Sequence, residues 1–229
     1  MLFAVKAQTN GNDFIIIHDI KLNTDQIKYI CDRHYGIGCD QLIIFKRIQS
    51  NIFGLEFYNN DGSIANMCGN GSCAFTLFVD KYIDNKLSEI YINVMDIQYK
   101  AEMINNYTSI IFPMPYYMDN NSTICTGNYH RVYNINRINN VLEIKKEYSH
   151  CNIHFIEENI VNNTVKVITF ERGAGRTLAC GSGAIAVSFY LNKNIKIIHE
   201  GGTSEVVIIN NGMQLITQPK IVCKCYVNI

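Results

Sequence analysis

Short hydrophobic runs separated by polar turns make up most of the chain, and many of these runs are rich in Ile, Val, Phe and Tyr. Runs of this kind are typical of β-strands. They predict strands at Phe14–His18, Leu42–Phe45, Gly54–Tyr58, Glu89–Val94, Thr108–Phe112, Val165–Phe170 and Val206–Ile209. Helical patterns are few: one covers Thr24–Asp32, with Thr24 as its N-cap, and one follows each of Cys68 and Cys180. The pattern therefore predicts many strands and few helices.

One arrangement of residues occurs twice along the chain. Aligned on Cys68 and Cys180, each copy has a strand that ends in an aromatic residue, then a polar pair nine and eight residues before the cysteine. The pair is Asn59-Asn60 in the first copy and Glu171-Arg172 in the second. In both copies Cys-Gly-x-Gly follows and leads into a small, apolar stretch that is compatible with a helix.

A shorter echo lies upstream of each cysteine, at Gly11–Phe14 and Gly127–His130, with similar spacing between the echoes. Matched repeats of this kind are expected of two structurally related halves. We place their boundary near Pro113–Asp119. The halves are then residues 1–115, which carry Cys68, and residues 116–229, which carry Cys180. The C-terminal strand, at about 220–229, could pack on the first half.

The two Cys-Gly-x-Gly elements can carry chemistry. A strand, a glycine turn and a helix that begins at Cys-Gly would direct several backbone N–H groups at one point. Such a helix start binds a carboxylate and stabilises a thiolate, and glycine permits close approach. One copy alone would favour a buried structural cysteine, whereas two copies favour function. One thiolate could remove an α-proton while the other thiol delivers a proton from the opposite side, which inverts the stereocentre without a cofactor.

Composition excludes several other classes of protein. The 20 basic and 20 acidic side chains balance, which gives no electrostatic basis for binding nucleic acid or a membrane surface. The amino terminus turns polar too early for a signal peptide and no stretch is long enough to span a membrane, so we expect a soluble, cytoplasmic protein. The nine cysteines contain no CxxC pair, so neither a disulfide framework nor a zinc ribbon is indicated. We expect no metal site, and we interpret five other residues as structural: Cys31, His34, Cys39, Cys223 and Cys225.

The motifs resemble the diaminopimelate epimerase family along nearly the whole chain. The matching segments are Gly11–Ile17, Arg33–Leu42, Phe57–Gly71, Gly127–His130, Cys151–Phe155, Glu171–Ala186 and Gly201–Ile208. The resemblance implies an α/β (α+β) fold of two pseudo-symmetric domains, each a curled sheet or barrel around a central helix. It places the active site in the cleft between the domains, with no cofactor, and we expect a homodimer whose partner is a small-molecule amino-acid substrate.

The resemblance also implies roles for the residues in these motifs. Cys68 and Cys180 would be the proton donor and acceptor, with His130 and Glu171 beside them to tune their ionisation. The reacting carboxylate would bind to Gly69, Asn70, Gly181 and Ser182. The rest of the substrate would contact Asn12, Gln41, Asn59, Asn128, Asn152, Glu171 and Arg172. Taken without the resemblance, Asn12 and Asn128 could be turn residues, His130 a structural histidine and Glu171-Arg172 an exposed charged pair. We assign Asp40 and Asp61 to turns and loops.

Three positions depart from the family's pattern. Cys73 stands where the family usually has Arg, Tyr129 where it has Pro, and Arg176 where Glu is usual. None of these changes removes a proposed substrate contact. Cys73, however, is five residues after Cys68 and could form a disulfide with it or disturb the helix start.

The leading hypothesis is epimerisation of LL- to meso-diaminopimelate, for lysine and peptidoglycan synthesis. One alternative is racemisation of another amino acid, such as histidine, by the same two-thiol chemistry, and another is a catalytically silent amino-acid-binding protein. Asn59, Asn152 and Arg172 favour diaminopimelate, because a substrate without a distal zwitterion would leave them unpaired. The two cysteines favour an enzyme, since binding alone requires no thiol.

Overall fold

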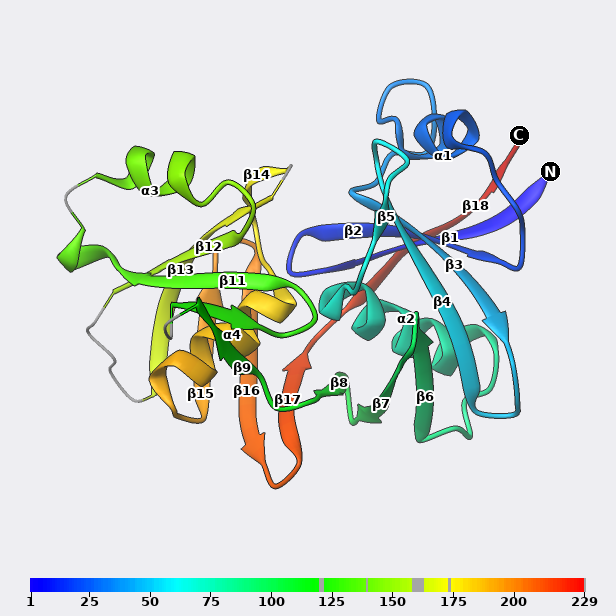
Figure 1. Cartoon of the computed structure of the whole chain (residues 1–229). Coiled ribbons are helices and arrows are strands. Elements are labelled where there is room, and N and C mark those ends of the chain that lie inside the picture. Colours follow the sequence, from blue (N-terminus) through cyan, green and yellow to red (C-terminus); the bar gives the residue numbers. More distant parts are fainter. Residues whose placement is uncertain (120–121, 139, 158–162, 173, 229) are drawn as a thin grey trace. The chain divides into compact units, whose positions relative to one another are not determined.

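The computed structural model describes residues 1–119, 122–138, 140–157, 163–172 and 174–228. The chain divides into two compact units (Figure 1). Unit 1 consists of Met1–Ile110 together with Gln218–Ile229, and unit 2 of Ile111–Thr217. In the described part of the chain, no helix has both the length and the apolar character that a membrane span requires.

Unit 1 is a mixed sheet that curls around one helix, α2. Its strands follow the order β18-β1-β2-β3-β4-β6-β7, with β5 paired to β4; the β2–β3 and β4–β6 pairs are parallel. Helix α2 packs against β1 and β18 near one end of this order and against β7 at the other, which shows the curl. The elements are β1 (Leu2–Thr9), β2 (Asn12–His18), α1 (Thr24–Cys31), β3 (Gln41–Arg47), β4 (Ile52–Asn59), β5 (Ile64–Ala65), α2 (Gly69–Tyr82), β6 (Glu89–Val94), β7 (Ile97–Ile104) and β18 (Lys220–Val227).

Unit 2 repeats this arrangement around helix α4. Its sheet order is β9-β10-β11-β12-β13-β15-β16-β17, with β14 paired to β13; here β11–β12 and β13–β15 are parallel. The division between the units falls within β8 (Tyr107–Phe112). The elements that follow are β9 (Tyr116–Met118), β10 (Thr123–Cys125), β11 (Tyr129–Asn134), η2 (Ile135–Arg137), α3 (Val141–Glu147), β12 (Asn152–Ile156), β13 (Thr164–Glu171), β14 (Gly175–Thr177), α4 (Gly181–Leu191), β15 (Ile195–His199), β16 (Gly202–Ile209) and β17 (Gly212–Thr217).

The two units share one topology. The series from β10 to β16 reproduces the antiparallel and parallel pairings of the series from β1 to β7 step by step. In each unit the first helix connects the first parallel pair and the central helix connects the second. The repeated cysteine motif is therefore part of a repeated fold, and the predicted α/β class with a curled sheet around a central helix is confirmed.

Local sequence explains where these elements begin. All seven predicted strands lie within observed strands. The predicted N-cap of α1 was wrong: the cap is Asn23, whose side chain accepts a hydrogen bond from Gln26 N–H at 2.9 Å, while Gln26 Oε1 accepts one from Asn23 N–H at 3.0 Å. This reciprocal pair is a capping box, which leaves Thr24 as the first helical residue.

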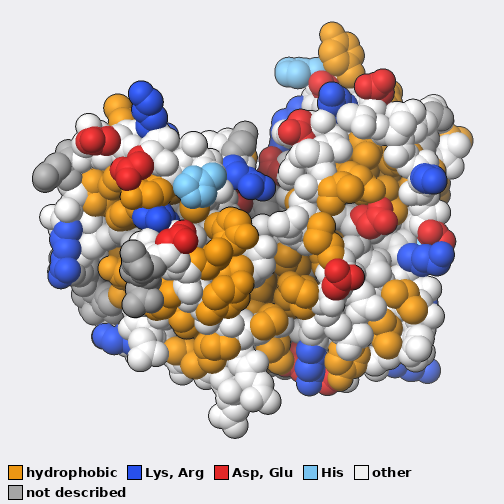
Figure 2. Space-filling model, viewed as in Figure 1, with side chains coloured by type: hydrophobic (Ala, Val, Ile, Leu, Met, Phe, Trp, Pro, Cys, Tyr) orange, Lys and Arg blue, Asp and Glu red, His pale blue; other side chains and the backbone are white. Residues whose placement is uncertain are grey.

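Charge on the surface follows the overall balance of the sequence. On the face in Figure 2, acidic and basic side chains are interspersed among hydrophobic and neutral ones.

The core of unit 1 lies under α2, where Phe75 is fully buried and its ring packs against those of Phe45 and Phe53 at centroid distances of 5.2 and 5.4 Å. The central helix is thereby fixed to the sheet, and its N-terminus is held in place.

Candidate active site

Helix α2 begins directly after Cys68, which caps the helix through its sulfur. The Cys68 backbone is extended, with φ −129° and ψ 106°, and its Sγ accepts a hydrogen bond from Gly71 N–H at 3.3 Å. A Cβ at Gly71 would lie 2.7 Å from Phe57 Cε1, so only glycine allows this turn to approach the sheet. The carbonyl of Asn70 is held by Thr9 Oγ1 at 2.9 Å. The first turn thus presents a thiol at the end of a helix whose dipole favours negative charge.

Asn12 connects the Cys68 thiol to a charged network. The thiol lies 3.9 Å from Asn12 Oδ1, and Asn12 Nδ2 donates to Asp40 Oδ2 at 3.0 Å. Arg33 in turn donates to Asp40 at 2.8 Å and to both carboxylate oxygens of Asp13 at 2.8 and 3.0 Å. Asp40, which we assigned to turn architecture, therefore also orients the Asn12 amide so that its oxygen faces the thiol.

Gln41 and Asn59 form a second polar group in unit 1. They are opposite each other in the register of β3 and β4, and Gln41 Nε2 donates to Asn59 Oδ1 at 2.9 Å. Asn59 Nδ2 donates to Ser63 Oγ at 3.0 Å. Gln41 Oε1 is buried and has no hydrogen-bond partner among the described residues. A buried amide oxygen without a partner can accept a hydrogen bond from a donor group of a ligand.

Helix α4 in unit 2 begins in the same way as α2. Cys180 has φ −132° and ψ 115°, and its Sγ accepts a hydrogen bond from Gly183 N–H at 3.4 Å. Ser182 Oγ lies 3.6 Å from the same sulfur. The two predicted cysteines therefore have the same backbone conformation and the same N-capping hydrogen bond, one at the start of each central helix.

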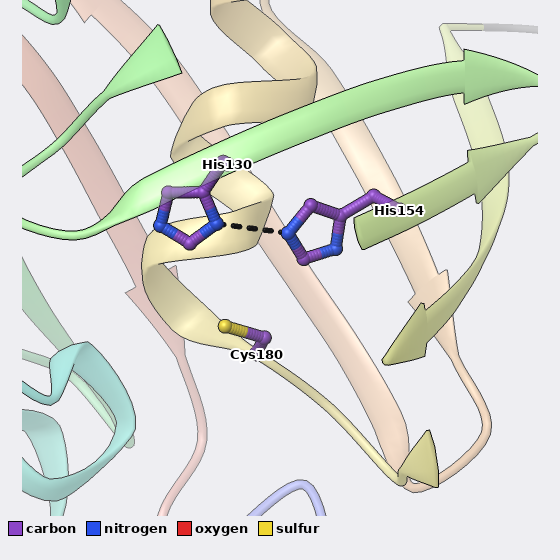
Figure 3. Close-up of side chains that lie close together, drawn as sticks. All are labelled: His130, His154 and Cys180. Atoms are coloured by element: carbon purple, nitrogen blue, oxygen red, sulfur yellow. Dashed lines mark hydrogen bonds between the residues drawn. The ribbon is translucent and has the colours of Figure 1, made fainter. Parts of the chain in front are cut away.

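Two buried histidines lie beside Cys180. His130 Nδ1 is 2.9 Å from His154 Nε2 (Figure 3). His154 Nδ1 is 3.1 Å from Thr169 Oγ1. One ligand atom from each of His130, His154 and Cys180 lies within 4.8 Å of the other two. Burial lowers the pKa of His130 to about 3, and burial together with the neighbouring histidines puts the pKa of His154 well below 6.5. Both rings are therefore neutral at neutral pH.

Sequence reasoning missed His154. The available signal was its spacing from Asn152, because residues two apart on a strand share a face. A Cβ at Gly183 would lie 2.1 Å from His154 Cε1, so the second glycine of Cys-Gly-Ser-Gly is what lets this ring pack against the helix start. The segment with Asn152 and His154 and the Cys-Gly-Ser-Gly segment therefore pack together as one structural unit. No spacing rule in the sequence reveals this contact.

The remaining predicted residues of unit 2 organise the loops near the end of β13. Asn152 Oδ1 accepts a hydrogen bond from Arg172 N–H at 2.9 Å, and Glu171 Oε1 accepts one from Thr177 Oγ1 at 2.7 Å. The Arg172 residue is exposed. Asn128 follows Gly127, whose φ of 94° makes the turn between β10 and β11, and its carbonyl accepts from Thr126 N–H at 3.0 Å.

The three departures from the family's pattern have different surroundings. Cys73 is fully buried in α2, and burial raises the pKa of its thiol to about 12. Tyr129 is exposed at the start of β11. Arg176 on β14 forms an ion pair with Glu200. Cys73 thus belongs to the core as a neutral thiol.

Solved structures with the same fold include a probable proline racemase and a phenazine biosynthesis protein. A probable proline racemase from Agrobacterium radiobacter has a TM-score of 0.79 at 8% identity and covers 100% of this chain and 93% of its own. A phenazine biosynthesis PhzF-family protein from Enterococcus faecalis has a TM-score of 0.75 at 11% identity, over 99% of both chains. At these identities the likeness defines the fold class.

Sequence relatives define the family. The diaminopimelate epimerase family pattern matches residues 4–94. Diaminopimelate epimerases from Flavobacterium psychrophilum and Rickettsia typhi are each 31% identical to this chain, over 88% and 87% of it and 88% and 84% of their own lengths. The chain belongs to the diaminopimelate epimerase family, as the motifs predicted, and it is an isomerase of the epimerase type.

Proposed function

We propose that this epimerase interconverts LL- and meso-diaminopimelate by proton transfer between its two N-capping cysteines. The observation that carries the proposal is the pair of matched helix starts, where Cys68 and Cys180 each accept a backbone hydrogen bond on sulfur. One thiolate would remove the α-proton, and the other residue, as a thiol, would protonate the opposite face of the same carbon. The product would supply lysine and peptidoglycan synthesis.

The chemistry requires stabilisation of a carbanion-like transition state, because an α-proton of an amino acid is a very weak acid. Preorganised N–H groups directed at the substrate carboxylate would supply it. We assign this role to the first turns of the two helices, at Gly69-Asn70 and Gly181-Ser182. All four residues are buried, with Asn70 and Ser182 only 1% and 4% exposed, which limits competition from water.

Neighbours of each sulfur support its proposed role. Asn12 Nδ2 donates to Asp40, which leaves Asn12 Oδ1 positioned to accept a hydrogen bond from a neutral Cys68 thiol. Beside Cys180, the neutral His130 and His154 rings are joined by one hydrogen bond, which fixes their orientation next to the sulfur. Glu171 keeps the role that the family resemblance implies, as a group that tunes Cys180.

The proposed substrate fits the polar groups away from the thiols. The distal end of diaminopimelate carries an ammonium group and a carboxylate. Gln41 Oε1, buried without a partner among the described residues, can accept from an ammonium group. Arg172 can bind a carboxylate through two parallel hydrogen bonds, and Asn152 holds its backbone. Asn59 and Asn128 would complete these contacts.

One experiment separates this function from its alternatives. The reduced protein is incubated in D₂O with LL-diaminopimelate, L-histidine or L-lysine, and α-deuteration is followed by mass spectrometry. We expect exchange with diaminopimelate far above that with the other two. Exchange confined to histidine would support a racemase of that amino acid, and binding without exchange of any substrate would support a silent binding protein.

A further inference from the structure

Three metal-binding atoms converge inside unit 2. They are a ring nitrogen of His130 on β11, a ring nitrogen of His154 on β12 and the sulfur of Cys180 at the start of α4 (Figure 3). Each atom lies within 4.8 Å of the other two, and all three residues are buried. The sequence analysis expected no metal here, because the three residues are far apart in the chain and follow no metal-binding motif. Only the fold brings them together.

The donors and their spacing suit Zn²⁺. Zinc binds imidazole nitrogen at about 2.0–2.1 Å and thiolate sulfur at about 2.3 Å, in tetrahedral geometry. These lengths place the two nitrogens roughly 3.3 Å apart and each of them roughly 3.6 Å from the sulfur. His130 Nδ1 and His154 Nε2 are 2.9 Å apart, so these two rings need to separate by a few tenths of an ångström to admit the ion. The sulfur lies within 4.8 Å of both nitrogens and needs to approach them by up to about 1 Å. Mg²⁺ and Ca²⁺ prefer oxygen ligands, and this cluster offers none.

The surroundings also fit a metal site. A histidine that binds a metal usually donates its other N–H to a nearby oxygen, and Thr169 Oγ1 lies 3.1 Å from His154 Nδ1. His130 Nε2 is buried and has no hydrogen-bond partner among the described residues. When Nδ1 becomes a ligand the proton moves to Nε2, which has no acceptor among the described residues, so His154 is the histidine of the pair that has the usual outer partner. Gly183 N–H holds the sulfur at 3.4 Å.

We propose that His130, His154 and Cys180 together bind one Zn²⁺ ion, with the fourth position left to water. The Cys180 thiol loses its proton to solvent, His154 keeps its proton on Nδ1 toward Thr169, and the His130 proton moves from Nδ1 to Nε2. One proton is released for each ion and nothing is oxidised. Bound zinc would withdraw Cys180 from proton transfer and inhibit the enzyme reversibly. Only this inhibition rests on the proposed function; the metal site itself does not.

The test measures binding without substrate. Protein reduced with a non-thiol reductant and freed of metal is titrated with Zn²⁺ against a chromogenic chelator, and with Co²⁺ by visible absorption. X-ray absorption at the zinc edge then counts the ligands. We expect one ion per chain, with one sulfur at about 2.3 Å and two imidazole nitrogens at about 2.0–2.1 Å. A shell of sulfur alone, or no stoichiometric binding, would overturn the proposal.

Two matched variants locate the site. His154→Phe keeps an aromatic ring in the same space but removes both nitrogens, whereas His199→Phe removes a buried unit 2 histidine that contacts Ser204 and lies outside the cluster. Removing an outer partner of a metal ligand costs about 10–100-fold in affinity, so we expect His154→Phe to bind zinc at least about 100-fold more weakly and His199→Phe to match wild type.

Equal zinc affinity in His154→Phe and wild type would contradict the site. Circular dichroism reports whether each variant folds, and the ligand count on the wild-type protein decides the question if His154→Phe does not. If zinc binds as described but no α-proton is ever exchanged, the metal site stands and the proposed function fails.

Discussion

The surroundings of each cysteine decide what its thiol can do. Cys68 and Cys180 lie at helix N-termini, with backbone N–H groups directed at their sulfurs. Cys73 is only five residues from Cys68 but is fully buried, and burial raises the pKa of its thiol to about 12. A thiol in that state is a poor nucleophile and resists disulfide exchange. The repeated Cys-Gly-x-Gly motif singled out Cys68 and Cys180, but the sequence left the state of Cys73 open, because its burial depends on how α2 packs in the core.

Replacing either capping cysteine should abolish turnover. A serine hydroxyl is far too weak an acid to supply an anionic base near neutral pH, so Cys68→Ser and Cys180→Ser should each lower kcat by at least about 10²-fold. Cys73→Ala is the matched control, since it removes a thiol of α2 that makes no proton transfer, and it should keep most of the activity per folded molecule. Near-full turnover in either serine variant would rule out the two-thiol mechanism.

Arg172 should determine specificity for a substrate with a distal carboxylate. Arg172→Lys keeps the charge but loses the planar fork, so binding should weaken by about 1.5–3 kcal/mol, the range of a hydrogen bond to a charged group. The measurement is kcat/KM for diaminopimelate, together with residual exchange on lysine. A common loss on both substrates would mean that Arg172 supports the loop that Asn152 holds and does not contact the distal carboxylate.

At the scale of secondary structure, the glycines of the two motifs set how closely each central helix approaches its surroundings. The sequence predicted both helix starts, because Cys-Gly-x-Gly is a local signal. It did not predict what each second glycine touches: Phe57 beside Gly71 and His154 beside Gly183. It also misplaced the N-cap of α1. Asn23 and Thr24 are both suitable N-cap residues, and only the capping box that Asn23 forms with Gln26 identifies Asn23 as the cap.

Gly183→Ala should displace His154 and damage both folding and catalysis. The new Cβ would lie 2.1 Å from His154 Cε1, so the ring must move away from the helix start. Overpacking of this kind costs about 1–3 kcal/mol of unfolding free energy, which denaturant titration can measure. Because the Cys180 environment changes, kcat should fall further than the loss of folded protein explains. An unchanged kcat per folded molecule would show that the His154 ring has no influence on Cys180.

At the scale of the whole molecule, the structural repeat covers more of the chain than the repeated sequence motifs indicated. A few shared residues around Cys68 and Cys180 predicted two related halves, and the pairing of strands in the two units follows one plan from β1 to β7 and from β10 to β16. Sequence identity could not reveal this, because strand pairing is set mainly by which faces are buried. β18 pairs with β1, so the C-terminal strand lies in unit 1, the half on which we expected that it could pack.

Stability of unit 1 should fall in acid because of Asp13. Burial tends to raise the pKa of Asp13, but hydrogen bonds from Arg33 and Lys6 outweigh it, and the pKa is held below its ordinary value of 3.8. Asp13 therefore stabilises the fold at pH values above about 4, and this contribution is lost as pH falls through the lower pKa of the folded state. Asp40 faces the same Arg33.

Urea unfolding at a series of pH values tests this prediction. Wild-type protein should lose stability more steeply below pH about 4 than Asp13→Asn, which has no carboxylate to protonate at this position. Asp19→Asn is a suitable control, because its carboxylate lies 3.9 Å from Lys46 in a largely exposed pair. Parallel curves for wild type and Asp13→Asn would show that the Asp13 network does not govern acid stability.

The central claim is that two different residues exchange the proton, and the timing of deuterium incorporation tests it most directly. LL-diaminopimelate is mixed with wild-type enzyme in D₂O, and both stereoisomers are separated and weighed by mass spectrometry at the first few per cent of conversion. Two thiols predict that the meso product carries one solvent deuterium at the inverted carbon while the remaining LL substrate carries almost none. Meso product that keeps its original proton at early times would show a single base acting on both faces, and would contradict the account.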